Sequence, residues 1–269
     1  MENLTETIKG RKSVRTFDGN PLSEQHKSAI LRFATEISNP FDIPVEFEIL
    51  DAESNNLSSP VLSGERNYAV GKVQKKPYAD VAFGYSFEQL VLYAATLGIG
   101  TVWIGGTMKR ELFESAAGLK DGEMMPCISP LGYPATKRSI KESMMRKGVG
   151  ADSRLSGEKL FFDGAWGQNL LPDAELKEVL ELVRWAPSAV NKQPWRIILK
   201  DGIFHFYEKK DKGFVNENVG DMQKVDLGIA LCHFVLGYEE KGRQAKVSIC
   251  DPGLEIPSDA QYLASVEIF

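Results

Sequence analysis

The sequence predicts an α+β fold in which helices pack on a mostly antiparallel sheet, with two similar halves in tandem. At 269 residues the chain is long enough for one large domain or two ordinary ones. Helix-like and strand-like segments alternate along it, and the same order of segments occurs twice. We therefore expect one half at residues 1–150 and the other at residues 151–269.

The composition is that of an ordinary globular protein, with 43% hydrophobic and 26% charged residues. The net charge is −5 and no basic region dominates, so a nucleic acid is not an expected partner. Every stretch of about 18 residues carries charges, so no membrane-spanning segment is expected. The first residues lack the basic and apolar parts of an export signal, and the three cysteines lie far apart in sequence. Both observations favour a cytoplasmic location.

Several enzyme chemistries lack the residues that they need. The histidines and cysteines form no cluster with the spacing of a metal site. The phosphate-binding P-loop and the esterase GxSxG motif are absent, and the glycines at 98–106 do not match the GxGxxG motif of dinucleotide-binding folds. We therefore assign no metal ligand and no catalytic side chain, and we expect a cofactor to carry any chemistry.

The first long helix of each half can be aligned with its counterpart, residues 20–34 with residues 169–183. In both segments apolar residues recur at the spacing of one helix face. Asn20 or Ser23 can cap the first helix, and Asp173 can cap the second. Helix–strand alternation is common in unrelated segments, but the matching order favours a duplication.

The remaining elements follow in the same order in both halves. A strand-like run comes after the helix and a proline–aromatic pair. A second helix is apolar over most of its surface and is therefore expected to be buried, and another strand ends the half. These segments are residues 45–50, 85–97 and 126–131 in the first half, and residues 196–199, 226–236 and 263–269 in the second. The stretch 137–157, rich in Lys, Arg, Ser and Gly, is expected to connect the halves.

One polar motif occurs only in the first half, as Arg11-Lys12-Ser13-Val14-Arg15. In an extended segment alternate residues point to one side, so Arg11, Ser13 and Arg15 would share a face. Guanidinium groups bind phosphate oxygens in pairs, and a serine hydroxyl adds a donor. The motif therefore suits a phosphate, although spacing alone favours an exposed basic strand.

A second polar motif occurs only in the second half, after its first helix. Pro187 disfavours helical geometry at Ala186, so the helix is expected to end there. Ser188, Asn191 and Gln193 would then lie in a short loop, where they could bind the edge of a planar heterocycle. A capped helix end followed by a turn explains the same residues.

A third segment, residues 97–106, combines a helix end and a strand with the pair Gly105-Gly106. Glycine lets the backbone approach a flat ring closely, although an ordinary helix cap before a buried strand fits as well. Each half thus holds a polar motif that the other lacks. This is the pattern expected of one site assembled from both halves.

Together these segments resemble the nitroreductase family of FMN-dependent oxidoreductases. Residues 11–17 resemble its R-x-S-x-R-x-F element, and residues 186–195 resemble its A-P-S-x-x-N-x-Q-P-W element. Residues 97–106 and 131–134 resemble later signatures of the family. In that family two subunits intertwine around FMN, whereas here the two motifs are split between the repeats. The chain is thus similar to the branch in which two family domains are fused into a pseudo-dimer, so a monomer is possible and a homodimer is not excluded.

The resemblance assigns cofactor binding to twelve residues. Those expected at the phosphate and ribityl chain are Arg11, Lys12, Ser13 and Arg154. Those expected at the flavin ring are Arg15, Trp103, Ile104, Gly105 and Gly106, and those expected at the ring and the ribityl edge are Pro187, Ser188 and Asn191. Two positions depart from the family pattern, because Gly105 replaces a common glutamate and Asp152 replaces a lysine.

The function that this resemblance implies is transfer of hydride from NAD(P)H through FMN to nitroaromatics, quinones or similar electron-poor acceptors. The missing glutamate leaves open an FMN-binding or flavin-storage protein without significant turnover. A relic that binds nothing is a third reading, which the retained polar motifs argue against. The sequence identifies neither the physiological acceptor nor the preferred nicotinamide.

Overall fold

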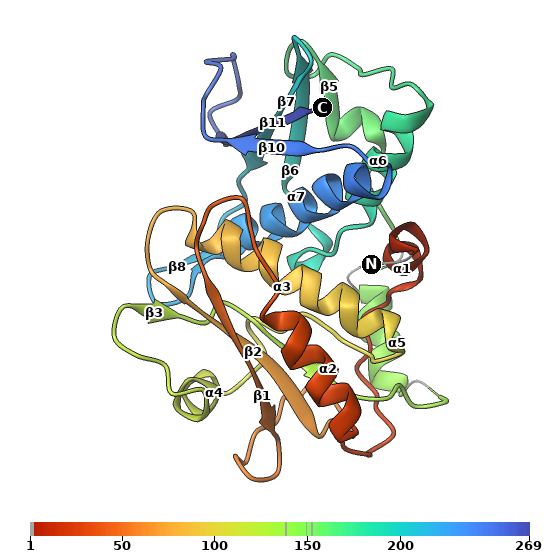
Figure 1. The fold of residues 1–269 in the computed structure, drawn as a ribbon, viewed down its shortest axis with the longest axis vertical. Coiled ribbons are helices and arrows are strands. Elements are labelled where there is room, and N and C mark those ends of the chain that lie inside the picture. The colour runs from red at the N-terminus through yellow and green to blue at the C-terminus, as the bar shows by residue number, and fades with distance from the viewer. Residues whose placement is uncertain (1–2, 138, 149, 152) are drawn as a thin grey trace.

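The computed structural model describes residues 3–137, 139–148, 150–151 and 153–269. Two sheets lie at opposite ends of the molecule, and two long helices, α3 (Ala79–Thr96) and α7 (Met222–Glu240), lie side by side between them (Figure 1). All but one pair of neighbouring strands in these sheets are antiparallel. The predicted α+β class, with helices on a mostly antiparallel sheet, is confirmed.

The first sheet is built around a strand that the sequence analysis did not predict. This strand, β2 (Asn67–Gln74), pairs with β1 (Val45–Asp51), β3 (Glu123–Met124) and β4 (Ile128–Leu131). Helix α2 (Glu24–Ala34) begins where its cap was predicted, because the hydroxyl of Ser23 accepts a hydrogen bond from the backbone N–H of His26. Helix α4 is Arg110–Ala116.

The second sheet has the order β10-β11-β7-β6-β5. Its strands are β5 (Phe161–Asp163), β6 (Trp195–Lys200), β7 (Ile203–Lys209), β10 (Ala245–Ser248) and β11 (Ala260–Ile268). Helix α6 (Ala174–Trp185) begins after Asp173, whose carboxylate accepts from the N–H of Leu176. The pairing of β6 with β7 and of β7 with β11 repeats that of β1 with β2 and of β2 with β4. A duplication with halves 1–150 and 151–269 predicts this correspondence, and that division stays a prediction.

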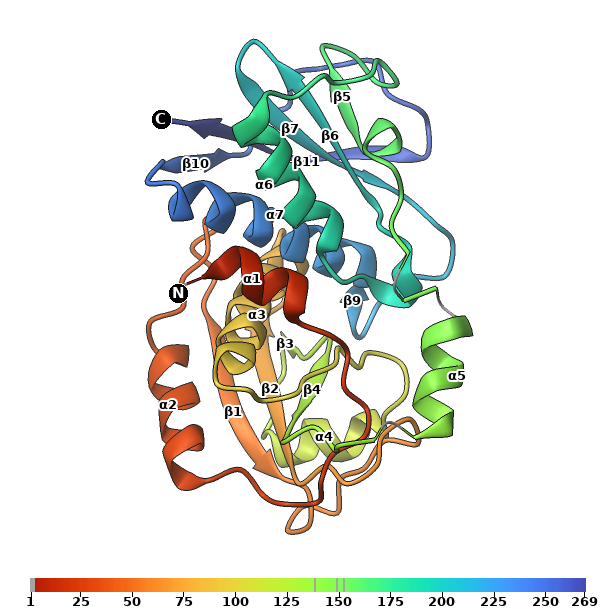
Figure 2. The same cartoon turned by 90° about the vertical axis from the view of Figure 1, so that its right-hand side faces the viewer.

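The shorter elements complete the fold. Helix α1 (Leu4–Gly10) packs against α3, α6 and α7, so the N-terminal segment contacts both parts of the fold (Figure 2). The connecting stretch 137–157 contains α5 (Ile140–Gly148), which lies to one side of the molecule. The rest are the 3₁₀ turns η1 (Gly157–Lys159) and η2 (Ala189–Asn191) and the hairpin strands β8 (Val215–Asn216) and β9 (Gly220–Asp221).

The helices α3 and α7 cross at two glycines. A Cβ atom at Gly84 of α3 would overlap the carbonyl oxygen of Val225, and one at Gly228 of α7 would overlap that of Val81. In each helix the valine precedes the glycine by three positions, so the two contacts are reciprocal. Only glycine lets the two backbones approach this closely.

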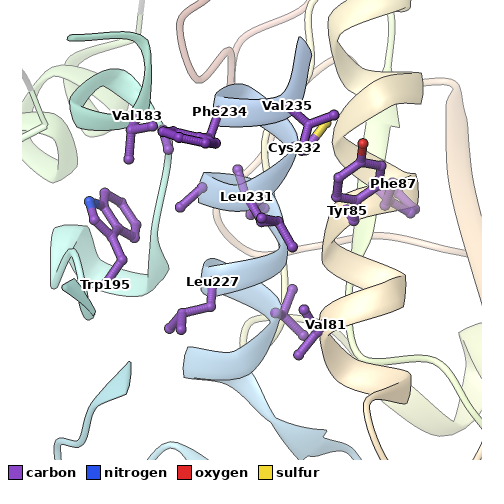
Figure 3. Close-up of a cluster of buried hydrophobic side chains, with 14 of the residues drawn as sticks. Val81, Tyr85, Phe87, Val183, Trp195, Leu227, Leu231, Cys232, Phe234 and Val235 are labelled. Atoms are coloured by element: carbon purple, nitrogen blue, oxygen red, sulfur yellow. The ribbon is translucent and has the colours of Figure 1, made fainter. Parts of the chain in front are cut away.

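The side chains of α7 form the centre of the core between α3 and α6. Figure 3 shows Phe234 beside Val183 of α6, while Cys232 and Val235 face Tyr85 of α3. This burial confirms the prediction that the second helix of each half lies inside.

Among the described residues, no helix combines the length and the apolar character that crossing a membrane requires.

Candidate functional site

A cavity of about 890 Å³ lies between the two parts of the fold. Its wall includes all twelve residues to which the sequence assigned cofactor binding. They are Arg11, Lys12, Ser13, Arg15, Trp103, Ile104, Gly105, Gly106, Arg154, Pro187, Ser188 and Asn191. The structure therefore brings together segments from both ends of the chain, and the binding role of each residue stays a prediction.

The Arg11–Arg15 segment runs alongside Thr101. The backbone N–H of Val14 donates to the carbonyl of Thr101 at 2.9 Å, which fixes the segment against the cavity wall. Among the described residues, neither Nη1 of Arg11 nor Nε of Arg15 has a hydrogen-bond acceptor, although both atoms are buried. Buried N–H groups of a guanidinium without an acceptor favour an anion or a carbonyl oxygen in the cavity.

Charges of both signs act on these arginines. Burial lowers the pKa of Arg11, a change that Glu88 opposes and Arg146 reinforces. Burial also lowers the pKa of Arg15, opposed by Glu142 and reinforced by Arg146. Arg146 lies on α5 and also lines the cavity, so its charge acts there on both Arg11 and Arg15. The sequence analysis missed Arg146 because it assigned its segment to a connection.

The loop after α6 has the predicted helix end. Ala186 is extended, with φ −52° and ψ 134°, because Pro187 follows it. The hydroxyl of Ser188 accepts from the N–H of Gln193 at 2.9 Å, and the amide of Asn191 donates to the carbonyl of Gly150 at 2.8 Å. These side chains hold the loop in shape at the edge of the cavity.

The Gly105-Gly106 turn is held by a residue that the sequence analysis missed. The guanidinium of Arg110 donates to the carbonyls of Gly105 at 2.8 Å, Met125 at 2.6 Å and Pro126 at 3.1 Å. The strand expected across 97–106 is wrong, because this segment makes only isolated bridges. A Cβ at Gly106 would meet no atom within 4 Å, so the turn faces open space on that side.

Gly105 itself is closely packed. A Cβ there would lie 2.7 Å from Cε of Met222 and 3.3 Å from Sγ of Cys127. Two sulfur-containing side chains thus occupy the space beside Gly105, where the resemblance implies a glutamate in the family. Both side chains also line the cavity.

Trp103 is anchored by a buried polar network. Its Nε1 donates to the carboxylate of Glu88 at 3.0 Å, and the other oxygen of Glu88 lies 2.9 Å from Nε2 of His233. The second ring nitrogen of His233 bonds the carbonyl of Leu182 at 2.9 Å. Glu88 and His233 are 145 residues apart, so no local sequence signal could have paired them.

Arg154 lies over the indole of Trp185, with its guanidinium carbon 5.1 Å from the ring centroid. Its Nη1 donates to the carbonyls of Ala151 at 3.0 Å and Ser153 at 2.7 Å. The family's lysine position, Asp152, lies outside the described residues. Arg154 thus lies in the cavity wall, where hydrogen bonds to the carbonyls of its own loop fix its side chain.

Residues 3–238 match the family model described as "Putative TM nitroreductase". The chain belongs to this nitroreductase family. Family membership makes it an oxidoreductase in general terms. No curated protein matches the chain by sequence.

Solved structures of nitroreductase family proteins resemble this chain to different degrees. A "putative nitroreductase" from Thermotoga maritima is 23% identical with a TM-score of 0.64, over 98% of this chain and 93% of that chain. A nitroreductase family protein from Clostridium novyi is 19% identical with a TM-score of 0.43, over 51% of this chain and 87% of that chain. An FMN-dependent nitroreductase from Clostridium difficile is 16% identical with a TM-score of 0.43, over 49% of this chain and 88% of that chain. The first likeness shows that this chain shares its fold with the Thermotoga protein.

The cavity wall also includes an acidic side chain. Asp226 of α7 is buried, and both its carboxylate oxygens lie 3.0 Å from the N–H of Ala189. Burial raises the pKa of Asp226 well above its ordinary value, against the effect of this hydrogen bond. The carboxyl group of Asp226 thus fixes the first residue of η2.

Proposed function

We propose that this chain binds FMN in the cavity and passes hydride from NAD(P)H to nitroaromatics, quinones or similar electron-poor acceptors. One observation carries the proposal: twelve residues chosen from sequence, and drawn from both ends of the chain, line a single cavity. Its volume, about 890 Å³, lies within the range of roughly 300–1,000 Å³ that is typical of ligand and cofactor sites.

The residues present fit a phosphorylated flavin. Arg11 and Arg15 offer buried N–H donors that lack acceptors among the described residues, and Arg146 adds positive charge. A phosphate provides the acceptor oxygens and the negative charge that such groups need. We assign the phosphate and ribityl chain to Arg11, Lys12, Ser13 and Arg154, as the resemblance implies.

The ring would lie along the backbone of Trp103–Gly106. Gly106 leaves open space on its Cβ side, and Arg110 fixes the turn through three carbonyls. FMN, when bound, supplies the hydride chemistry, so the chain needs no catalytic acid or nucleophile of its own. Its residues position the reactants and supply charge, with Arg15 favouring negative charge on a bound ring.

A second candidate function is FMN binding or storage without significant turnover. The observation that favours it is the packing at Gly105, where Met222 and Cys127 occupy the place of the family's glutamate.

We further propose that the two halves make the chain a pseudo-dimer that exists as a monomer. Light scattering during size-exclusion chromatography measures this directly, and a mass near twice that of one chain would contradict it.

The test of the main proposal is direct. FMN is titrated into the purified protein, and saturable quenching of flavin fluorescence with one site per chain is expected. Anaerobic NADH or NADPH should then bleach the flavin absorbance, and a nitroaromatic or quinone should restore it. Absence of FMN binding would refute the proposal, whereas bound FMN that neither nicotinamide reduces would select the storage protein.

A further inference from the structure

Val190 in η2 has a strained backbone. Its φ of 43° and ψ of 30° lie in the left-handed region, which β-branched side chains rarely adopt. Asn191 and Gln193 also have positive φ, at 58° and 52°, but asparagine tolerates this region well and glutamine lacks the branch at Cβ that makes valine an outlier there. Val190 is therefore the β-branched residue among the three with positive φ, and the one for which this conformation costs most.

The neighbours of Val190 impose this conformation. Before it, the N–H of Ala189 donates to Asp226 at 3.0 Å; after it, the amide of Asn191 donates to the carbonyl of Gly150 at 2.8 Å. The hydroxyl of Ser188 closes the loop by accepting from the N–H of Gln193 at 2.9 Å. None of these bonds uses the side chain of Val190, so an asparagine at this position would keep them and relieve the strain.

The side chain of Val190 adds little to the core. It is 60% exposed and lines the cavity, together with the 73% exposed Val215 and the half-buried Phe214 of the β8–β9 hairpin. Because its side chain is mostly exposed, the packing of Val190 does not offset the free-energy cost of its strained backbone. Strain of this kind commonly accompanies a functional contact.

We propose that Val190 is a specificity-determining residue whose isopropyl group forms an apolar wall for flat, apolar aromatic acceptors, quinones among them. The inference rests on the proposed function. In the reaction concerned, NAD(P)H gives up two electrons and one proton and the solvent supplies a second proton, so that a quinone becomes a hydroquinone and NAD(P)⁺ leaves. Val190 acts on the binding of the acceptor and takes no part in the proton or electron transfers.

The test compares two acceptors, menadione and ferricyanide. Menadione is an apolar quinone that must enter the cavity, whereas hydrophilic ferricyanide accepts one electron at a time, so that one NAD(P)H reduces two. The variant V190T keeps the branched shape and the strain but adds a hydroxyl, and V190N relieves the strain. The matched control is I249T, which changes an exposed apolar residue that does not line the cavity.

Both Val190 variants should lower kcat/KM for menadione by about 5-fold, the effect of losing about one buried apolar group, with ferricyanide changed by less than about 2-fold. Only V190N should raise Tm, by about 2–4 °C. The Kd for FMN should stay within about 2-fold in both variants, and I249T should match the unmodified protein.

Unchanged kcat/KM for menadione in both variants, in a protein that binds FMN and turns over, would overturn the role of Val190 and leave the proposed function standing. An equal fall with both acceptors would also overturn it. A protein that binds no FMN would overturn the proposed function, and the role of Val190 with it.

Discussion

Oε1 of Glu88 on α3 lies 2.9 Å from Nε2 of His233 on α7, and both side chains are buried. The carbonyl of Leu182 can only accept, so the imidazole nitrogen bonded to it carries a proton. The other carboxylate oxygen of Glu88 accepts a hydrogen bond from Nε1 of Trp103 at 3.0 Å. The pair therefore joins both long helices to Trp103 in the cavity wall.

The substitution Glu88→Gln should destabilise the protein by about 3 kcal/mol, because it breaks a buried pair and leaves His233 without its acidic partner. Urea unfolding measures the free energy, and tryptophan fluorescence should change as Trp103 loses its charged acceptor. Glu53→Gln is the matched control, since Glu53 pairs with Arg66 at the surface. Equal stability of the two variants would show that the network contributes little.

Arg11→Ala should weaken FMN binding by about 10- to 100-fold, the effect of losing a hydrogen bond to a charged group. Arg11→Lys keeps the charge but loses the planar fork, so its Kd should be intermediate. Quenching of flavin fluorescence measures the Kd for FMN of the unmodified protein and of both Arg11 variants. Arg66→Ala provides a surface control. An unchanged Kd in Arg11→Ala would remove the phosphate role of this residue.

Gly84→Ala and Gly228→Ala should each destabilise the fold by about 3 kcal/mol or more, because the added methyl overlaps a backbone carbonyl that cannot move away easily. Gly10→Ala is the control, since a Cβ there meets no atom within 4 Å. It should change the unfolding free energy by less than about 1 kcal/mol. Thermal and urea unfolding of the three variants check the expectation.

Because of Glu208, the free energy of unfolding should fall as the pH rises from 5 to 7. Burial, with a smaller effect from Asp221, raises its pKa from 4.5 to about 7. Over this range the unfolded chain releases the proton while the folded protein retains it, so rising pH favours unfolding. Glu208→Gln should therefore be more stable than the unmodified protein at pH 8 by about 2 kcal/mol, and equally stable near pH 4.

Urea unfolding at several pH values checks this, with the exposed Glu217→Gln as control. Asp80, whose burial raises its pKa to about 6, acts in the same direction and remains in both proteins. The difference between the unmodified protein and Glu208→Gln therefore reports Glu208 together with its effect on Asp80. A difference that does not vary with pH would contradict the expectation.

Local signals predicted the helix ends well. Ser23 and Asp173 cap α2 and α6 because their side chains accept from the first turn, and Pro187 ends α6 because the residue before proline avoids helical geometry. The central strand β7 was missed although Asp201-Gly202, both with positive φ, form the hairpin turn before it. That dipeptide was a usable signal.

Other features could not be read from local pattern. Strand β2 is buried on both faces, so it lacks the alternation that marks a strand with one exposed face. Arg110 and Glu88 act through carbonyls and side chains that only the folded chain brings near them. Residues that a family motif contains could thus be placed at the site, while the residues that hold those motifs in position could not.

The reciprocal glycine crossing of α3 and α7 has a consequence for dilute solution. Both helices belong to one polypeptide, so their encounter is an intramolecular event whose effective concentration the linking chain sets. The packing of these helices should therefore survive at nanomolar protein, where two separate subunits held by the same surfaces would dissociate by mass action.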